Sequence, residues 1–266
     1  MITHFKEIFK YRELLMTFVK KSLDARYKGS FLGFLWTFVN HLAHLVVFTI
    51  VFQYIFNVAT PNYSMFLFVC LVPWTEFTSA ISGSLVSITG NANLVKKIYF
   101  PRQLLPLSVS LTYMVDFTYC IPIIFLAMLI SKMHFTIALI FLPIIMLLQC
   151  IFQTGICYIV AALNVKYRDI KQIVGIITMA WIYANPIFYP LERLSGIVIL
   201  GRTVSDFWLP LLNPISSVVI SYRDIMYFGK IPSITNLVVA LISGIIVYTI
   251  GLLVFNHFEK TFAEDV

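Results

Sequence analysis

Charged side chains are scarce in this chain: Asp, Glu, Lys and Arg make up only 12% of its 266 residues. A water-soluble domain typically carries about 25% of them, and it would not need a mean hydropathy of +0.90. Six apolar runs hold at most one or two charges each: 31–56, 63–88, 104–130, 135–163, 173–191 and 234–256. Each run has roughly the 20 residues that a helix needs to cross about 30 Å of hydrocarbon, whereas barrel strands would be shorter and alternating. We therefore expect a membrane protein with six transmembrane helices.

Cysteine is also rare, and the pattern of the cysteines excludes the usual roles of clustered thiols. The four are Cys70, Cys120, Cys150 and Cys157, all within apolar runs. No C-x-x-C pair occurs, and no histidine stands nearby at ligand spacing. The pattern predicts packing residues, and it indicates neither a disulfide framework nor a metal site.

The sequence lacks the phosphate-binding motif G-x-x-x-x-G-K-[ST] as well. The nearest match, GKIPS at 229–233, lacks the first glycine and the hydroxyl after the lysine. No cleavable signal is expected, since the first apolar run begins only at Phe31, after a long basic stretch. No internal repeat is visible either, so we expect one six-span domain over 31–266, preceded by a short N-terminal element over 1–30.

Positive charge is divided unevenly between the loops. With the N-terminus inside, 14 of the 19 Lys and Arg fall on the cytoplasmic side: Lys6, Lys10, Arg12, Lys20, Lys21, Arg26, Lys28, Lys96, Lys97, Arg102, Lys166, Arg168, Lys171 and Lys260. The other five are Lys132, Arg193, Arg202, Arg223 and Lys230. Cytoplasmic loops carry such an excess, so we expect both termini in the cytoplasm. The net charge of +7 then reflects topology and contact with anionic lipid, and no nucleic-acid-binding pattern is present.

Residues 1–30 are predicted to form a basic amphipathic helix and a turn. Its apolar face is expected to hold Phe5, Ile8, Phe9, Leu15, Met16, Val19 and Leu23. Such a helix lies in the lipid headgroup plane, where it either only anchors the fold or also frames an entrance for a lipid-like substrate. Gly29 and Gly33 predict a bend before the first span.

Two polar segments, 90–106 and 163–174, lie on the cytoplasmic side between apolar runs. In the first, Asn91 or Asn93 is expected to cap a short helix and Pro101 to end it. In the second, Arg168 and Asp169 stand at a new helix start. Two short cytosolic helices suggest docking onto a soluble protein, although solvated loops made basic by topology would have the same composition.

Two carboxylates, Glu76 and Asp116, lie within the predicted spans. An ionised carboxylate there costs at least about 2.5 kcal/mol, so each is expected to face a partner, a cavity or an interface. His41 and His44 either bond to such polar groups or, as we favour, have structural roles. One candidate function is a proton-coupled secondary transporter or flippase that uses Glu76 and Asp116. A membrane enzyme would need a catalytic cluster at the membrane face, and no such motif is apparent.

Five ordered blocks resemble the signature stretches of type-2 ABC exporter permeases for polysaccharides. They are LDARYKGSFLGFLWTFVNHL (23–42), NANLVKKIYFPRQLLPLS (91–108), LNVKYRDIKQIV (163–174), NPIFYP (185–190) and NPISSVVISYRDIMYFG (213–229). Permeases of this family export O-antigen, capsule or teichoic-acid chains, and the sequence looks most like the O-antigen class, which moves undecaprenyl-diphosphate-linked glycans. The resemblance implies an all-α fold in the plasma (inner) membrane. It also implies a homodimer with two ATPase subunits, which would use the ATP and Mg²⁺, while this chain itself would be no enzyme and hold no cofactor.

The resemblance also implies roles for particular residues. Segment 91–101 is similar to the coupling helix that contacts the ATPase, and Leu32 and Gly33 match a turn at the cytoplasmic entrance. Segment 195–229 resembles a pair of short external re-entrant helices that gate the exit. The implied ATPase-coupling residues are Asn91, Asn93, Lys96, Lys97, Tyr99, Pro101, Arg168 and Asp169.

The substrate class implied by the resemblance nominates further residues. Arg26, Lys28 and Arg102, with Tyr27 alongside, are candidates for binding a diphosphate, because a guanidinium matches phosphate oxygens. The same charges also serve orientation through the positive-inside bias. Flat sugar faces stack on aromatic rings, although Trp and Tyr also form interfacial belts. The candidate pore aromatics are Phe34, Trp36, Trp74, Trp181, Tyr183, Phe188 and Tyr189.

Overall fold

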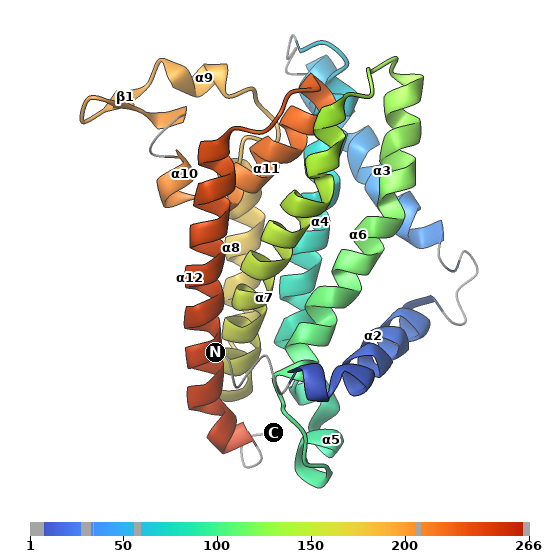
Figure 1. Cartoon of the computed structure of the whole chain (residues 1–266), viewed down its shortest axis with the longest axis vertical. Coiled ribbons are helices and arrows are strands. Elements are labelled where there is room, and N and C mark those ends of the chain that lie inside the picture. Colours follow the sequence, from blue (N-terminus) through green and yellow to red (C-terminus); the bar gives the residue numbers. More distant parts are fainter. Residues whose placement is uncertain (1–7, 28–32, 34, 56–59, 206–208, 263–266) are drawn as a thin grey trace.

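The computed structural model describes residues 8–27, 33, 35–55, 60–205 and 209–262, which form a bundle of long helices (Figure 1). Among these residues, five helical segments are long and apolar enough to cross a membrane: Leu35–Ile55, Tyr63–Leu85, Leu104–Ile130, Ile137–Lys166 and Ile234–Thr261. Their helices are α3 (Leu35–Thr49) with η1 (Ile50–Ile55), α4 (Tyr63–Leu85), α6 (Leu104–Ile130), η3 (Ile137–Phe141) with α7 (Leu142–Lys166), and α12 (Ile234–Phe258) with η6 (Glu259–Thr261). Five of the predicted spans therefore have a counterpart in the structure.

The fifth predicted span, 173–191, is shorter than expected. Its helix, α8, runs over Ile170–Ala184 and has 15 residues. Asn185, which follows, is extended with ψ 147°, because the ring of the next residue, Pro186, disfavours helical backbone before it. The apolar run therefore continues past the helix as the buried, non-helical residues Ile187 and Phe188.

α4 lies at the centre of the bundle, since 78% of its apolar window is buried, against 6% for the segment of α3 and η1. None of the described residues of α8 is buried either. Both α3 and α8 therefore present apolar side chains outward, among them Val46, Val47, Ile176 and Met179.

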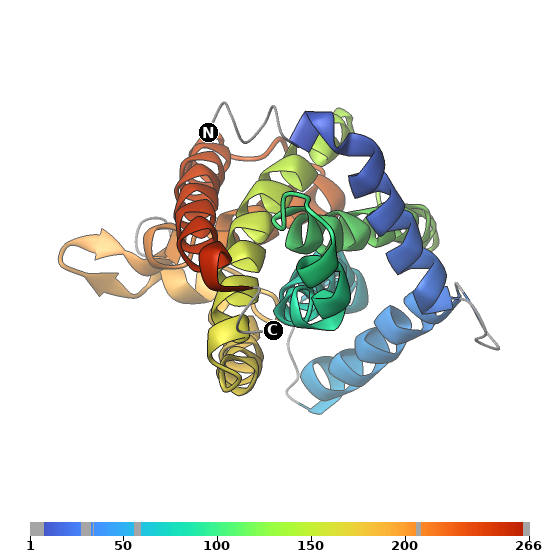
Figure 2. The same cartoon turned by 90° about the horizontal axis from the view of Figure 1, so that it is seen from below.

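The lower end of the bundle in Figure 1 carries α2 (Arg12–Tyr27) and α5 (Ala92–Lys97). A hydrophobic cluster joins them to α7 and α12 through Leu15, Val95, Tyr158 and Phe255. Seen from below, α2 lies along the side of the bundle, where it packs on α6 (Figure 2).

The predicted apolar face of the N-terminal helix is only partly correct. Leu15 and Val19 are buried, but Phe9 and Met16 are exposed. Successive residues of a helix turn by about 100°, so Met16 points well away from Leu15. The helix therefore packs one apolar strip against α6 and leaves Met16 exposed.

At the upper end, the two Asn-Pro dipeptides of the sequence meet. The side-chain amide of Asn213 donates to the Asn185 side-chain oxygen at 3.0 Å and to the Ala184 carbonyl at 3.1 Å. Its own oxygen accepts a hydrogen bond from the Trp181 indole at 2.8 Å. Asn213 thus satisfies groups at the C-terminal end of α8, which an α-helix leaves without partners.

The prediction of a first gate helix is wrong over residues 197–204. Here β1 (Val198–Ile199) and β2 (Arg202–Thr203) pair as an antiparallel hairpin, which projects from the upper end together with α9 (Glu192–Ser195) (Figure 1). Leu200 and Gly201 between the strands both have positive φ, 52° and 74°. That geometry is required by the commonest tight hairpin turns and is incompatible with a helix. Among the described residues of the first predicted gate helix, the α-helical part is Leu209–Leu212, as α10.

The second predicted gate segment is helical but lies inside the protein. α11 (Ile215–Arg223) continues as the π-helix η5 (Asp224–Phe228), and every residue of α11 is buried. It packs against α4, α7 and α12. The helix is therefore part of the core of this chain rather than a free external flap.

Arg223 joins α11 to the segment that follows α8. Its guanidinium donates to the carbonyl oxygens of Pro186 at 2.5 Å and Ile187 at 2.9 Å, and it lies 3.7 Å from the centre of the Phe66 ring. Burial raises the pKa of the neighbouring Asp224 carboxyl to about 6, although Arg223 and Lys230 act to lower it. The buried Arg223 side chain thus connects α11 to α4 and to the segment that follows α8.

α7 and α12 form the tightest helix pair. A β-carbon placed on Gly155 would lie 2.6 Å from backbone atoms of Val247 and Tyr248, and one on Gly251 would overlap the backbone of Gly155. Small residues permit such close approach between membrane helices, where dispersion contacts replace the hydrophobic effect as the driving force. The two glycines therefore set the distance between these helices.

Candidate functional site

A polar pocket of about 530 Å³ opens between α2, α3, α4 and α6. It is lined by Arg26 from α2, by Trp36, Thr37, Asn40, His41 and His44 from α3, by Thr75, Glu76 and Ser79 from α4, and by Tyr113 and Asp116 from α6. We call it the α2–α6 pocket. Its lining combines hydrogen-bonding groups with charges of both signs, which is unusual within membrane-spanning helices.

A second pocket, of about 470 Å³, adjoins the first and reaches α8. The two share Ser79 and Tyr113. On the far side the second pocket is lined by Gly175, Thr178, Met179, Ile182 and Tyr183 of α8. Together the two pockets form a groove along α4, flanked by α3 and α8, which bury few of their described residues.

Arg26, in the last turn of α2, reaches into the α2–α6 pocket and forms an ion pair with Asp116 of α6. Its guanidinium also lies 4.2 Å from the centre of the Tyr113 ring. The Asp116 side chain is 1% exposed, whereas 33% of the Arg26 side chain is exposed. The carboxylate thus holds the guanidinium, while part of the Arg26 side chain remains exposed.

Glu76 of α4 pairs with His41 of α3, with 3.2 Å between Glu76 Oε1 and His41 Nε2. The other ring nitrogen of His41, Nδ1, is 2.5 Å from the Thr37 carbonyl oxygen. Both intramembrane carboxylates therefore have a partner on another helix. His41 therefore bonds to polar groups, and the purely structural role favoured from the sequence is wrong for this residue.

The other predicted entrance residues are dispersed. Tyr27 is the last residue of α2 and Gly33 lies in a turn before α3, while Lys28 and Leu32 lie outside the described residues. Arg102 does not line the α2–α6 pocket, and its guanidinium donates to the Glu259 carbonyl at 2.7 Å. The structure thus separates Arg102 from Arg26, and Arg102 interacts with the end of α12.

The predicted coupling segment is helical over a shorter range than 91–101. α5 ends at Lys97, and Ile98 is extended, so the helix ends before Pro101. Asn91 is at the N-cap position but makes no capping bond, and its side-chain amide donates back to the Ser87 carbonyl at 2.8 Å. Asn93 lies within the helix. Val95 is buried, whereas Lys96, Lys97, Ile98 and Tyr99 are exposed, Tyr99 by 97%.

The second polar segment begins α8, with Asp169 at the N-cap position and no capping bond from its side chain. Arg168 and Asp169 are both exposed. They lie in the short connection between Lys166, the last residue of α7, and α8.

The candidate pore aromatics divide into two groups. Trp36, Trp74 and Tyr183 line the groove, and of these Trp36 and Tyr183 are about half exposed. Trp74 and Phe188 are buried, Trp181 bonds to Asn213, and the Tyr189 hydroxyl donates to the Tyr183 carbonyl at 3.4 Å. Phe34 lies outside the described residues. Sequence reasoning missed Tyr113, which lines both pockets and lies beside Arg26.

Comparison with known proteins agrees with this architecture. The family profile described as ABC-2 type transporter matches residues 13–227. The O-antigen export system permease protein RfbA of Myxococcus xanthus is 32% identical over 266 residues, which is 100% of both chains. A protein of the same name from Klebsiella pneumoniae is 31% identical over 253 residues, 95% of this chain and 94% of the relative. The resemblance inferred from the sequence blocks is confirmed, and the chain belongs to the ABC-2 type transporter family as an integral membrane transport subunit.

Proposed function

We propose that this chain is the transmembrane subunit of an ATP-driven exporter that moves an undecaprenyl-diphosphate-linked polysaccharide, such as O-antigen, across the plasma (inner) membrane. The names of its relatives support an O-antigen substrate. The observation that carries the proposal is Arg26, whose side chain is partly exposed and paired with Asp116 at the edge of a polar groove between apolar helices. Diphosphate oxygens would meet the guanidinium there, and the glycan would follow the groove past Trp36 and Tyr183.

The membrane arrangement we propose has six crossings and both termini in the cytoplasm. α8 would be the short crossing, since it is apolar and lies beside α4 and α7. Basic residues at the α5 end, among them Lys96, Lys97 and Lys166, support a cytoplasmic position for that end of the bundle.

The exporter we propose contains two copies of this chain. α3 and α8 flank the groove and expose apolar side chains on their outer faces. A second copy covering these faces would close the open side of the groove and turn it into a pathway. Polar groups in this pathway would then be shielded from lipid, as groups within a membrane must be.

Charge removal at Arg26 tests the entrance. In Arg26→Gln the guanidinium is lost, and because hydrogen bonds to charged groups contribute about 1.5–3 kcal/mol each, export of lipid-linked glycan should fall at least about tenfold. Arg26→Lys should retain only part of the activity, since an ammonium cannot form the two-pronged contact. The measurement is surface glycan in cells that produce equal amounts of each variant in the membrane.

A structural role for Arg26 would give a different pattern. Arg26→Gln leaves the Asp116 carboxylate buried without its ion-pair partner, so the double variant Arg26→Gln/Asp116→Asn removes both charges together. Export restored by the double variant would contradict phosphate binding by Arg26. Arg12→Gln, on an exposed position of the same helix, is the matched control and should export normally.

The ATPase partner that we propose docks at α5 and at the adjacent turn of Arg168 and Asp169. Val95 anchors α5 to its own chain, while Lys96, Lys97 and Tyr99 point into open space. Replacing these three residues with alanine should lower copurification of the ATPase subunit severalfold and reduce export in parallel. A nearly fully exposed tyrosine beside two lysines offers contact area and charge to a partner but contributes little to the chain's own stability.

The control for the triple variant is Arg193→Ala/Lys230→Ala, which removes two exposed charges at the opposite end. Unchanged ATPase copurification in the triple variant would contradict the docking site. Export that continues without any ATPase subunit but stops when the proton gradient collapses would favour the rival secondary transporter using Glu76 and Asp116.

A further inference from the structure

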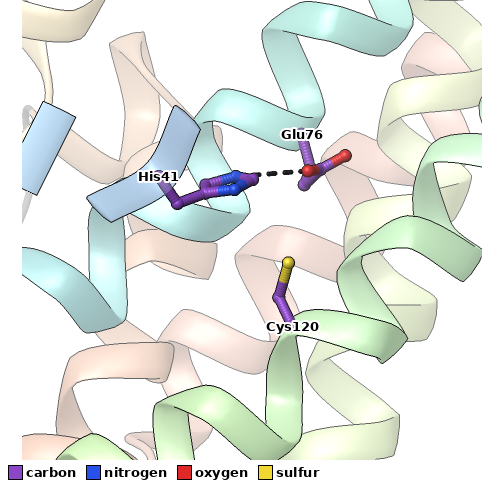
Figure 3. Close-up of side chains that lie close together, drawn as sticks. All are labelled: His41, Glu76 and Cys120. Carbon is purple, nitrogen blue, oxygen red and sulfur yellow. Dashed lines mark ion pairs between the residues drawn. The ribbon is translucent and has the colours of Figure 1, made fainter. Parts of the chain in front are cut away.

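Three potential ligand side chains from three helices converge beside the α2–α6 pocket: His41 of α3, Glu76 of α4 and Cys120 of α6 (Figure 3). All three residues are buried, and one ligand atom of each lies within 4.8 Å of the others. In Figure 3 the sulfur of Cys120 points toward the space beneath the His41 ring and the Glu76 carboxylate. This cluster could not be predicted from the sequence, since spacing along a chain does not show which helices will meet.

The donor atoms fit a borderline transition metal. Imidazole nitrogen, carboxylate oxygen and thiolate sulfur are the ligand types of Zn²⁺. With Zn–N and Zn–O bonds of about 2.0 Å at tetrahedral angles, the two donor atoms lie about 3.3 Å apart. The distance from His41 Nε2 to Glu76 Oε1 is 3.2 Å. An ion could therefore replace the direct contact without moving α3 away from α4.

The hydrogen bond of His41 orients its ring for metal binding. Its Nδ1 is 2.5 Å from the Thr37 carbonyl oxygen, so Nδ1 carries the hydrogen and the lone pair of Nε2 is directed at the cluster. Metal-bound histidines are oriented by a bond of this kind at their second nitrogen. His41 and Glu76 also line the open pocket, which leaves room for a water molecule as the fourth ligand.

The charges are balanced as well. A divalent ion, one carboxylate and one thiolate sum to zero, and the neighbouring Arg26–Asp116 pair is also neutral. Uncompensated charge is costly between membrane helices, so neutrality favours occupation of the site. The same neutrality holds without metal if His41 is protonated against Glu76 and Cys120 keeps its proton, which gives the alternative that an experiment must separate.

We propose that His41, Glu76 and Cys120 bind one divalent transition-metal ion of the Zn²⁺ type. The ion would connect α3, whose surface is mostly outside the core, to α4 and α6 at the wall of the groove. Its binding would favour the conformation in which α3 lies against α4, and it would stabilise that conformation by mass action.

Cobalt provides a direct probe of the site. The purified full chain, carrying a tag without histidines and stripped with a chelator, is titrated with Co²⁺, whose bond to a thiolate gives a near-ultraviolet charge-transfer band. We expect one Co²⁺ per chain, displaced by Zn²⁺. Cys120→Ser should abolish the band, and Glu76→Gln and His41→Ala should each weaken binding at least about tenfold.

Cys150→Ser is the matched control, since this cysteine lies on α7 outside the cluster and should leave the titration unchanged. Size-exclusion profiles identify any variant that has lost its fold. A wild-type chain without a thiolate band, or a band that persists in Cys120→Ser, would overturn the proposal. The first result would leave His41 and Glu76 as a hydrogen-bonded pair without metal.

Discussion

Arg223→Met should produce a chain that unfolds well below the wild-type melting temperature. The substitution deletes the hydrogen bonds to the Pro186 and Ile187 carbonyls and the contact with the Phe66 ring. Hydrogen bonds to charged groups contribute about 1.5–3 kcal/mol each. The variant no longer has to bury a cation, which offsets part of this loss, so we expect the free energy of unfolding to fall by about 2–4 kcal/mol. At 2–4 °C per kcal/mol for a chain of this size, the apparent melting temperature in detergent should fall by roughly 5–15 °C.

The pH dependence of the Arg223 variant gives an independent check. Asp224 has a pKa of about 6, raised by burial and held down by Arg223. The pKa of this carboxyl is higher in the folded protein than in the unfolded chain. Protonated Asp224 therefore favours the folded state at low pH, and this contribution is lost as the pH rises through the folded pKa. Without Arg223 the pKa of Asp224 should rise further, so the variant should be more destabilised near pH 8 than near pH 5.

The control for Arg223→Met is Arg193→Met, an exposed arginine of the same end of the molecule, which should melt like the wild type. Arg223→Lys should be intermediate, because a lysine can keep the charge but not the fork of two bonds. Equal melting temperatures for Arg223→Met and the wild type would show that α11 is held by apolar packing alone.

The membrane helices could be predicted from the sequence because span length is a local property. The run 104–130 coincides with α6 at both ends, and Asn185-Pro186 marks the end of α8 although the apolar run continues. The hairpin after α9 could not be foreseen in the same way. Its turn needs positive φ at Leu200 as well as at Gly201, and a leucine gives no signal for that conformation.

The residues of the candidate site could be predicted only in part. Glu76 and Asp116 were identifiable because carboxylates in apolar runs need partners, but their partners could not be identified. Arg26 is 90 positions from Asp116 in the sequence, and Cys120 faces His41 and Glu76 only because α3, α4 and α6 pack together. Tertiary packing decides which faces of the helices meet, and the periodicity of the sequence carries no information about this packing.

Gly251→Ala should separate α7 from α12 and destabilise the whole bundle. The added methyl group would overlap the backbone of Gly155, and backbone atoms cannot rotate out of the way as a side chain can. Overpacking costs about 1–3 kcal/mol, so the apparent melting temperature should fall by roughly 2–12 °C. Gly155→Ala should act similarly, because its β-carbon would lie 2.6 Å from the backbone of Val247.

The matched control is Gly175→Ala on α8, where an added β-carbon meets nothing within 4 Å. There the substitution removes only the flexibility of glycine, which should leave the melting temperature unchanged or raise it slightly, since alanine is favoured over glycine within helices by about 1 kcal/mol. A Gly251→Ala variant that behaves like Gly175→Ala would mean that α7 and α12 have room between them. A lower melting temperature for Gly251→Ala, without any decrease for Gly175→Ala, would show by thermal unfolding in detergent that α7 and α12 are in close contact.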